Sequence, residues 1–465
     1  MHQGIRNMED YFKLPIVLRA KELEEELRTG ATKPFKKIIK AHSEDCHALG
    51  QKPITFLRQV LILVTYPELM KDPRFPEDAK ERARVILAGC NNGSIGSYSE
   101  NSGIETIRRH CAEFIEHRDG IHSDWQNITL SPGTSGGIRN ILQLLAWKLN
   151  GKDPGVMIPK PSFPLYDACL QELNMHSVPY FLNEKKNWGV DLKELNKSFD
   201  DSTSTCTLRA IIVNNPGNPT GHVFTLQNIQ EIIKFAYNRS LIILADESQQ
   251  GNVYDGSRFH SVKRVMIEMG PPYCDIELAS FMSVSKGYIG ESGVRGGYVE
   301  VVNMDPDVYQ MYVKSLVCPS SLGQAAVHCL VDAPKEGEAS YRGFLMEKNE
   351  ILLSFKEKAK LCSEIMNSIN GITCNPVQGA VYAFPRITMP AKALNAAKYE
   401  NQLPDVFYTF QLLEKTGICV IPGSTFGQKP GTWYFRTTIL PLEEEFGEML
   451  KGFREFHTKF LTMYS

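Results

Sequence analysis

Residues 208–247, LRAIIVNNPGNPTGHVFTLQNIQEIIKFAYNRSLIILADE, hold two apolar runs on either side of a helical pattern. The runs at 208–216 and 241–247 are short and rich in β-branched residues, which favours strands. Between them, residues 225–239 carry apolar side chains at helical spacing, and Thr225 is placed to cap the helix. A strand, a helix and a second strand in this order are typical of a parallel sheet with helices on its faces.

The same alternation extends to both sides of this stretch. Short apolar strands separated by helices predict a largely parallel sheet that is covered on both faces. Further strands are expected at 127–133, 155–159, 176–182, 276–285 and 296–302, and helices at 134–150 and 164–174.

Outside this region the pattern is mainly helical, and after residue 340 it is of the α+β type. Helices are expected at 14–28, 76–89, 103–120, 341–369, 404–416 and from about 441, with strand-like runs at 373–387, 418–423 and 432–440. We therefore expect an α/β fold with a large domain at 96–340 and a smaller C-terminal α+β domain at 341–465. Residues 1–95 are expected to supply an N-terminal arm and the first part of the small domain.

The composition excludes several classes of partner. The formal net charge of the 465 residues is −2, which gives no electrostatic reason to expect nucleic acid or a membrane surface. No stretch approaches the ~18 apolar residues of a membrane span. The 11 cysteines are scattered without a CxxC pair, which favours reduced thiols over a disulfide or metal framework. Residues 1–27 lack the apolar region of a signal peptide and balance their basic residues with acids, so we expect a cytoplasmic protein, with the mitochondrion as the open alternative.

Polar residues follow the predicted strands where a parallel sheet binds its ligands, beyond the carboxyl ends. The loop 131–137, SPGTSGG, opens a helix with small hydroxyls and free N–H groups that suit a phosphate. Prolines and glycines around Asn218 would fix its amide, and Asp246 and Lys286 each come directly after a strand. Taken singly, these features also fit a glycine turn, an irregular turn, a helix cap or ion pair, and a solvated loop lysine.

Taken together, these residues match the needs of pyridoxal phosphate. That cofactor requires an amine to bond to its aldehyde, an acid beside its pyridine nitrogen and a cradle for its phosphate. Lys286 and Asp246 would provide the first two, and the amine would then act as general base and acid. Ser283 and Arg295 would add a hydroxyl and a fork-shaped cation to the phosphate.

The sequence resembles the fold-type I pyridoxal-phosphate aminotransferases of class I/II, and most closely the alanine aminotransferases. The resemblance covers essentially the whole chain, with the motifs in matching order and spacing. The motifs are GQKPITFLRQV (50–60), GSYSENSGI (96–104), GVMIPKPSFPLY (155–166), NNPGNPTG (214–221), SVSKGYIGESGVRGGYVEV (283–301), NPVQGAVYAFPRI (375–387), GICVIPGSTFGQ (417–428) and FRTTILP (435–441).

The resemblance implies how pyridoxal 5'-phosphate would be held. Lys286 would bond to the cofactor, and Asp246 would face its pyridine nitrogen. Asn218 would bond to its phenolic oxygen, and Phe163 would stack on its ring, unless Phe163 is an ordinary core aromatic. Phosphate contacts are implied for Gly133, Thr134, Ser135, Ser283 and Arg295.

The resemblance also implies a homodimer and a substrate clamp. Tyr98 would reach the phosphate of the neighbouring subunit, with a packing role as the alternative. Arg436 would bind the substrate α-carboxylate as a two-pronged donor, with a structural ion pair as the alternative. Asn218 and residue 44 would also lie at the substrate.

Two positions depart from the family pattern. Gln249 stands where the family has a tyrosine that donates to the phenolic oxygen, and we expect slower turnover with the cofactor retained. Glu44, within Ser43-Glu44-Asp45, stands where the family has a glycine. A carboxylate there is expected to repel a substrate carboxylate unless the loop moves away.

The leading expectation is a ping-pong enzyme that transfers the amino group of L-alanine to 2-oxoglutarate, giving pyruvate and L-glutamate. Glu44 leaves a second expectation open, in which an amine or a basic amino acid is the donor. The two departures together leave a third, a degenerate paralogue that binds the cofactor with weak or no activity. β-Lyase or ring-forming chemistry on the same scaffold is a minor fourth.

Overall fold

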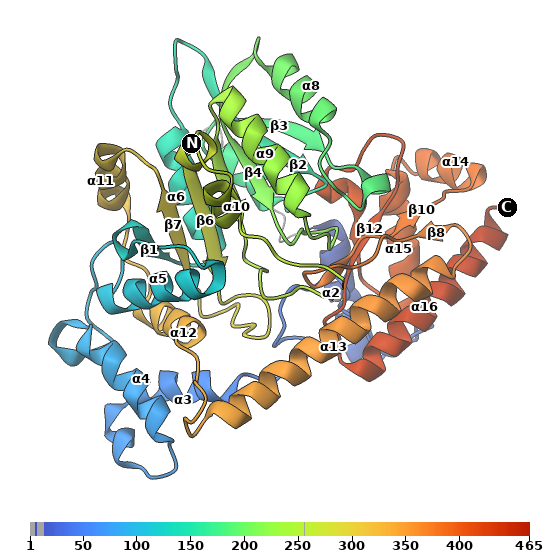
Figure 1. Ribbon diagram of the computed structural model, residues 1–465. Helices are drawn as coiled ribbons and strands as arrows, with labels where there is room; N and C mark the ends of the chain where they lie inside the picture. Colours follow the sequence, from blue (N-terminus) through green and yellow to red (C-terminus); the bar gives the residue numbers. More distant parts are fainter. Residues whose placement is uncertain (1–4, 7–13, 255) are drawn as a thin grey trace.

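A computed structural model of the protein describes residues 5–6, 14–254 and 256–465 (Figure 1). Within this part of the chain, seven strands form one sheet in the order β1-β7-β6-β5-β4-β2-β3. Neighbouring strands are parallel except around β7, which runs antiparallel to β1 and β6, so the predicted largely parallel sheet is confirmed. The strands are β1 (Ile128–Ser131), β2 (Asp153–Lys160), β3 (His176–Phe181), β4 (Cys206–Asn214), β5 (Ile242–Asp246), β6 (Leu278–Ser283) and β7 (Gly297–Val302).

Both faces of this sheet are buried under helices. In β4, Ile211 and Val213 pack into one core, whereas Ala210 and Ile212 pack into the core on the opposite face. This two-residue alternation between apolar layers explains why the strands read as continuous apolar runs. The first core is covered by α8 (Leu192–Ser202), α9 (Leu226–Arg239) and α10 (Val262–Glu268), and the second by α6 (Thr134–Leu145), α7 (Leu165–Glu172) and α11 (Pro306–Ser315).

The C-terminal part of the chain forms a separate α+β layer (Figure 1). Its long helix α13 (Tyr341–Asn367) lies alongside α16 (Glu443–Met463), and both cover a three-stranded sheet of order β11-β12-β9. The remaining elements are α14 (Ala391–Tyr399), α15 (Pro404–Thr416), β8 (Ile372–Thr373), β9 (Tyr382–Ala383), β10 (Arg386–Ile387), β11 (Ile421–Pro422) and β12 (Phe435–Thr438).

The described residues before position 96 pack against two different parts of the molecule. Helix α2 (Pro15–Arg28) contacts α15, and Ile39 forms a bridge with Ile418 of the C-terminal layer. Helices α3 (Thr55–Thr65) and α4 (Glu77–Ala88) instead share a core with α5 (Glu105–Asp119), α12 (Ser321–Val331) and the strand β1. The domain boundaries at 95 and 340 therefore stay a prediction.

Short 3-10 helices connect several of these elements, and no helix among the described residues is long and apolar enough to cross a membrane. The 3-10 helices are η1 (Pro67–Lys71), η2 (Asn91–Gly93), η3 (Trp125–Asn127), η4 (Glu184–Lys186), η5 (Tyr273–Asp275) and η6 (Gly423–Phe426).

Helix α6 approaches the sheet so closely that Gly137 has no room for a side chain. A Cβ atom there would lie 2.7 Å from Val299 Cγ2 and 3.1 Å from Phe281 Cδ1. We expect Gly137→Ala to lower the free energy of unfolding by about 1–3 kcal/mol, because it overpacks this contact. Gly447→Ala in α16, where no atom lies within 4 Å of the added Cβ, should instead raise it by about 0.5–1 kcal/mol. Urea unfolding midpoints measure both, and a harmless Gly137→Ala would contradict the close packing.

Candidate active site

The carboxyl ends of the central strands form one edge, and residues predicted from the sequence gather there. Asp246 is the last residue of β5, while Asn218 and Lys286 lie in the loops that follow β4 and β6. The strand register pairs Asn214 with Asp246 and Asp246 with Phe281, so β4, β5 and β6 end at nearly the same level. A ligand at this edge can therefore contact three loops at once.

Asp246 presents a buried carboxylate with two local donors. The Tyr166 hydroxyl donates to Oδ2 at 2.7 Å, and the Ser248 N–H donates to Oδ1 at 3.2 Å. Burial raises the pKa of Asp246, and these hydrogen bonds, together with the charge of Lys286, reduce that rise. A buried carboxylate is stabilised by a nearby cation, so this position fits the protonated nitrogen of a ring.

The loop between β1 and α6 forms a cradle beside Arg295. The Arg295 guanidinium donates to the Pro132 carbonyl at 3.0 Å and to the Ser285 hydroxyl at 3.2 Å. Gly133 has a φ of +81°, and a Cβ atom there would lie 2.7 Å from the Arg295 guanidinium. Thr134 begins α6, and its buried hydroxyl lacks a hydrogen-bond partner among the described residues. A cation, an unpartnered hydroxyl and the start of a helix together fit a phosphate.

Three other predicted residues adjoin this edge. Ser135 lies in the first turn of α6 and is half-buried. Ser283 ends β6, and its buried hydroxyl accepts a hydrogen bond from the Ser285 N–H at 3.4 Å. The Phe163 ring packs edge to face on Tyr166, with ring centroids 6.2 Å apart. Tyr166 in turn donates to Asp246, so Phe163 is one residue removed from that carboxylate.

The two remaining predicted cofactor residues, Gln249 and Tyr98, differ in their surroundings. Gln249 is buried, and its side-chain oxygen lacks a hydrogen-bond partner among the described residues. An amide in this state has a free acceptor and is available to a ligand. Tyr98 is 85% exposed, so its ring is not packed into the site of its own chain.

One carboxylate, that of Glu44, ties the other predicted residues together. The Lys286 amine donates to Glu44 Oε2 at 2.7 Å, and the Tyr382 hydroxyl donates to the same oxygen at 2.9 Å. Arg436 forms a short ion pair with Oε1, and the Asn218 amide approaches that oxygen at 3.5 Å. Arg436 also donates to the Asn218 oxygen at 3.1 Å. The sequence predicted that Glu44 repels a substrate carboxylate, and the structure shows the carboxylate occupying the predicted clamp.

This contact fixes the charge states of the groups involved. Burial lowers the pKa of Lys286, but Glu44, together with Tyr382 and Cys46, raises it by more, so the amine is held as an ammonium. Burial alone raises the pKa of Glu44, but the charges of Lys286 and Arg436 hold it well below its usual range. Arg436 is buried and also donates to the His42 carbonyl at 3.0 Å.

Sequence reasoning missed Tyr166, Tyr382 and Ser285. Tyr166 falls in the first turn of the helix after β2, the same edge that holds the other residues, so its position was a usable signal. Tyr382 belongs to β9 of the C-terminal layer, within an apolar run that is typical of core. Ser285 is adjacent to Lys286 and was not assigned a role of its own.

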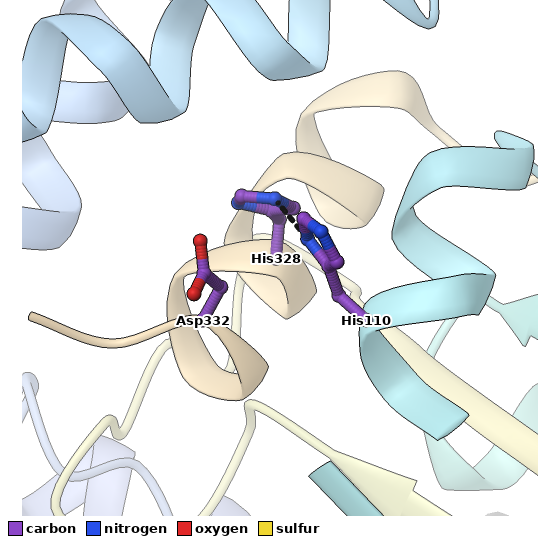
Figure 2. Close-up of side chains that lie close together, drawn as sticks. All are labelled: His110, His328 and Asp332. Atoms are coloured by element: carbon purple, nitrogen blue, oxygen red, sulfur yellow. Dashed lines mark hydrogen bonds between the residues drawn. The ribbon is translucent and has the colours of Figure 1, made fainter. Parts of the chain in front are cut away.

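A second titratable cluster lies away from this edge, between α5 and α12 (Figure 2). His110 Nδ1 and His328 Nε2 are 2.8 Å apart, and donor atoms of these two and Asp332 lie within 4.8 Å of one another. Both Asp332 oxygens already pair with cations, one with Arg82 at 3.0 Å and one with Lys335 at 2.9 Å. Burial lowers the pKa of His328 to about 3, so it stays neutral. These contacts link the two helices, while His328 Nδ1 is buried and has no hydrogen-bond partner among the described residues.

Replacing Tyr166 by Phe removes a donor from the Asp246 carboxylate and disfavours its charged form. We expect the affinity for pyridoxal 5'-phosphate to fall about tenfold, the effect of one hydrogen bond to a charged group. Tyr180→Phe is the matched control, because this buried hydroxyl also makes one bond of 2.7 Å, but to the Ile212 carbonyl. Absorbance titrations measure both variants, and equal losses of affinity would contradict a specific role for Tyr166.

Comparisons with known proteins show the family of the chain. The family described as aminotransferase class I and II matches residues 69–449. Alanine aminotransferase 2 of Xenopus tropicalis is 50% identical over 100% of this chain and 90% of its own length, and alanine aminotransferase 1 of Homo sapiens is 48% identical over 100% and 95%. Among solved structures, an alanine aminotransferase from Pyrococcus furiosus has the same fold, with a TM-score of 0.77 at 20% identity, over 99% of this chain and 100% of that one. The chain therefore belongs to the class I and II aminotransferases.

Proposed function

We propose that the protein is an alanine aminotransferase that uses pyridoxal 5'-phosphate. It would take the amino group of L-alanine, release pyruvate, and pass the amino group to 2-oxoglutarate to give L-glutamate. The full-length similarity to alanine aminotransferases supports this choice of substrates. The cofactor, when bound, accepts the amino group from one substrate and delivers it to the next.

The observation that carries the proposal is that an amine and a guanidinium reach the same carboxylate. Lys286 contacts one oxygen of Glu44 and Arg436 contacts the other. A 2-amino acid needs this arrangement, because its reacting carbon is bonded directly to its carboxylate. A clamp on the carboxylate therefore places that carbon beside the lysine.

The residues that would hold the cofactor act on its two ends. Asp246 would hold the proton on the ring nitrogen, with Tyr166 and Ser248 fixing the carboxylate. At the other end, Arg295 would pair with the phosphate in the cradle of Gly133, Thr134, Ser135 and Ser283. Phe163, Asn218 and Gln249 are assigned to the ring between these ends.

Lys286 would act as the base and acid of the reaction. Its Nζ atom would remove the proton from the substrate α-carbon and return it to the cofactor side. This task requires the neutral amine, whereas the contact with Glu44 stabilises the ammonium. The catalytic state therefore requires Lys286 to part from Glu44.

Two observations favour a second candidate, a family member with weak activity or another amino donor. Glu44 forms an ion pair with Arg436, the residue that would bind the substrate carboxylate. Gln249, where the family has a tyrosine, has an amide in place of a phenol. A donor panel that includes basic amino acids and amines separates this candidate from alanine transfer.

We propose that the active unit is a cytoplasmic homodimer. Apolar side chains that are unusually exposed support an interface, with Val317 at 84% and Tyr66 at 60%. Tyr98, exposed at 85%, would then enter the phosphate cradle of the partner subunit.

The first test is transfer from alanine. The purified protein, loaded with the cofactor, is expected to form pyruvate from L-alanine and 2-oxoglutarate. Arg436→Gln should lower kcat/KM for alanine on the order of 100-fold, because a buried charge pairing with the substrate is lost. Arg386→Gln, which removes a half-buried arginine paired with Glu184, is the matched control and should have little effect. Cofactor absorbance without pyruvate formation would reject alanine transfer.

Hybrid dimers test the proposed role of Tyr98. A Tyr98→Ala subunit supplies an intact Lys286, and a Lys286→Ala subunit supplies an intact Tyr98. Each variant alone should be impaired, and mixing them after dissociation should restore about a quarter of wild-type activity, since half of the random dimers hold one complete site. A mixture no more active than its parts would contradict a site shared between subunits.

A further inference from the structure

The Glu44 carboxylate is bound by donors from four separate parts of the fold. They are the loop after β6, strand β9, strand β12 and the loop after β4, which provide Lys286, Tyr382, Arg436 and Asn218. The carboxylate therefore has the contacts expected of a bound ligand. Glu44 itself belongs to the loop 40–45, which contacts β12 where Thr438 N–H donates to the Ala41 carbonyl at 2.9 Å.

Three of the five N–H donors of Arg436 are already used while Glu44 is in place. One terminal nitrogen serves Glu44 and Asn218, and the other donates to the His42 carbonyl. Of the remaining donors, Nε is buried and has no partner among the described residues. A substrate carboxylate would meet a partly occupied guanidinium and the negative charge of Glu44, so the two carboxylates compete for Arg436.

The surroundings of the loop leave room for the Glu44 side chain to turn toward solvent. The Glu44 side chain keeps 22% of its surface exposed, and its neighbour Asp45 faces solvent. Asp45 bonds to nearby residues of the chain, since its carboxylate accepts the Ala48 N–H at 3.0 Å and its own N–H donates to the Ser43 hydroxyl at 3.2 Å. A rotation of the Glu44 side chain toward solvent would hydrate its carboxylate and free Arg436 without disturbing the sheet.

We propose that Glu44 is an internal competitor for the substrate α-carboxylate, which has to leave Arg436 before a 2-amino or 2-oxo acid binds. The inference deepens the proposed function and rests on it for the choice of substrate class. The same departure removes the Glu44 carboxylate from Lys286. Glu44 thereby acts as a specificity-determining residue that weakens binding of carboxylic acids in general.

Binding of propionate to the cofactor-free protein tests the displacement directly. Propionate has the carboxylate and carbon skeleton of alanine without the amine, so no transfer chemistry is involved. We expect Glu44→Gln and Glu44→Gly to bind propionate at least about tenfold more tightly than wild type in isothermal titration, because the competing charge is gone. Asp45→Asn removes a charge from the same loop and is expected to bind propionate like wild type. Equal affinity in wild type and Glu44→Gln overturns the proposal.

The reactivity of Lys286 gives a second readout. Glu44 raises the pKa of this amine, so the fraction of neutral amine at a given pH is smaller in wild type than in Glu44→Gln. Reductive methylation of cofactor-free protein, followed residue by residue by mass spectrometry, should therefore modify Lys286 faster in Glu44→Gln, with its pH profile shifted to lower pH. Equal rates and pH profiles of Lys286 modification in wild type and Glu44→Gln overturn the proposal.

Steady-state kinetics separate the proposed alanine transfer from the proposed displacement of Glu44. If alanine is a substrate, Glu44→Gly should lower its KM, with Asp45→Asn unchanged. If alanine is not a substrate, the propionate and methylation results still decide the displacement. A higher KM of Glu44→Gln for a cationic amino donor, without tighter propionate binding, would show that Glu44 recognises a cation of the substrate. That result also overturns the proposal.

Discussion

The alignment of strand ends in the parallel sheet is the constraint on which the site depends. Because β4, β5 and β6 run in one direction and keep register, Asp246 and the loops that carry Asn218 and Lys286 emerge at one edge. The antiparallel β7 completes this edge, since Gly297 pairs with Ser131 on one side and Ser283 on the other. The loop after β1 is thereby placed beside Arg295.

Charge is distributed along this edge in a way that a parallel sheet alone does not require. Arg295 at the cradle and Lys286 and Arg436 at the substrate end are cations, and Asp246 and Glu44 are the anions opposite them. Asp246 lacks a directly paired cation among the described residues, and Glu44 has two. The first anion is thus open to a cofactor, whereas the second already balances the groups that a substrate needs.

The sequence predicted most of the sheet because its strands are short, apolar and separated by amphipathic helices such as the one capped by Thr225, whose hydroxyl accepts the Asn228 N–H. Helix α12 escaped prediction for a physical reason. Seven consecutive residues of α12, from Gln324 to Leu330, are buried, so it has no polar stripe from which a period can be read. The ion pair of Glu44 escaped because it depends on the position of the loop 40–45 against β12, nearly 400 residues away in the chain.

We propose that Lys286 is the amine to which the cofactor bonds. Reduction of the pyridoxal 5'-phosphate-loaded protein with borohydride would make that bond permanent, and mass spectrometry of the digested chain would locate it. We expect a phosphopyridoxyl group on the peptide that carries Lys286. A group on another lysine, or a protein that retains the cofactor with Lys286 unmodified, would contradict it.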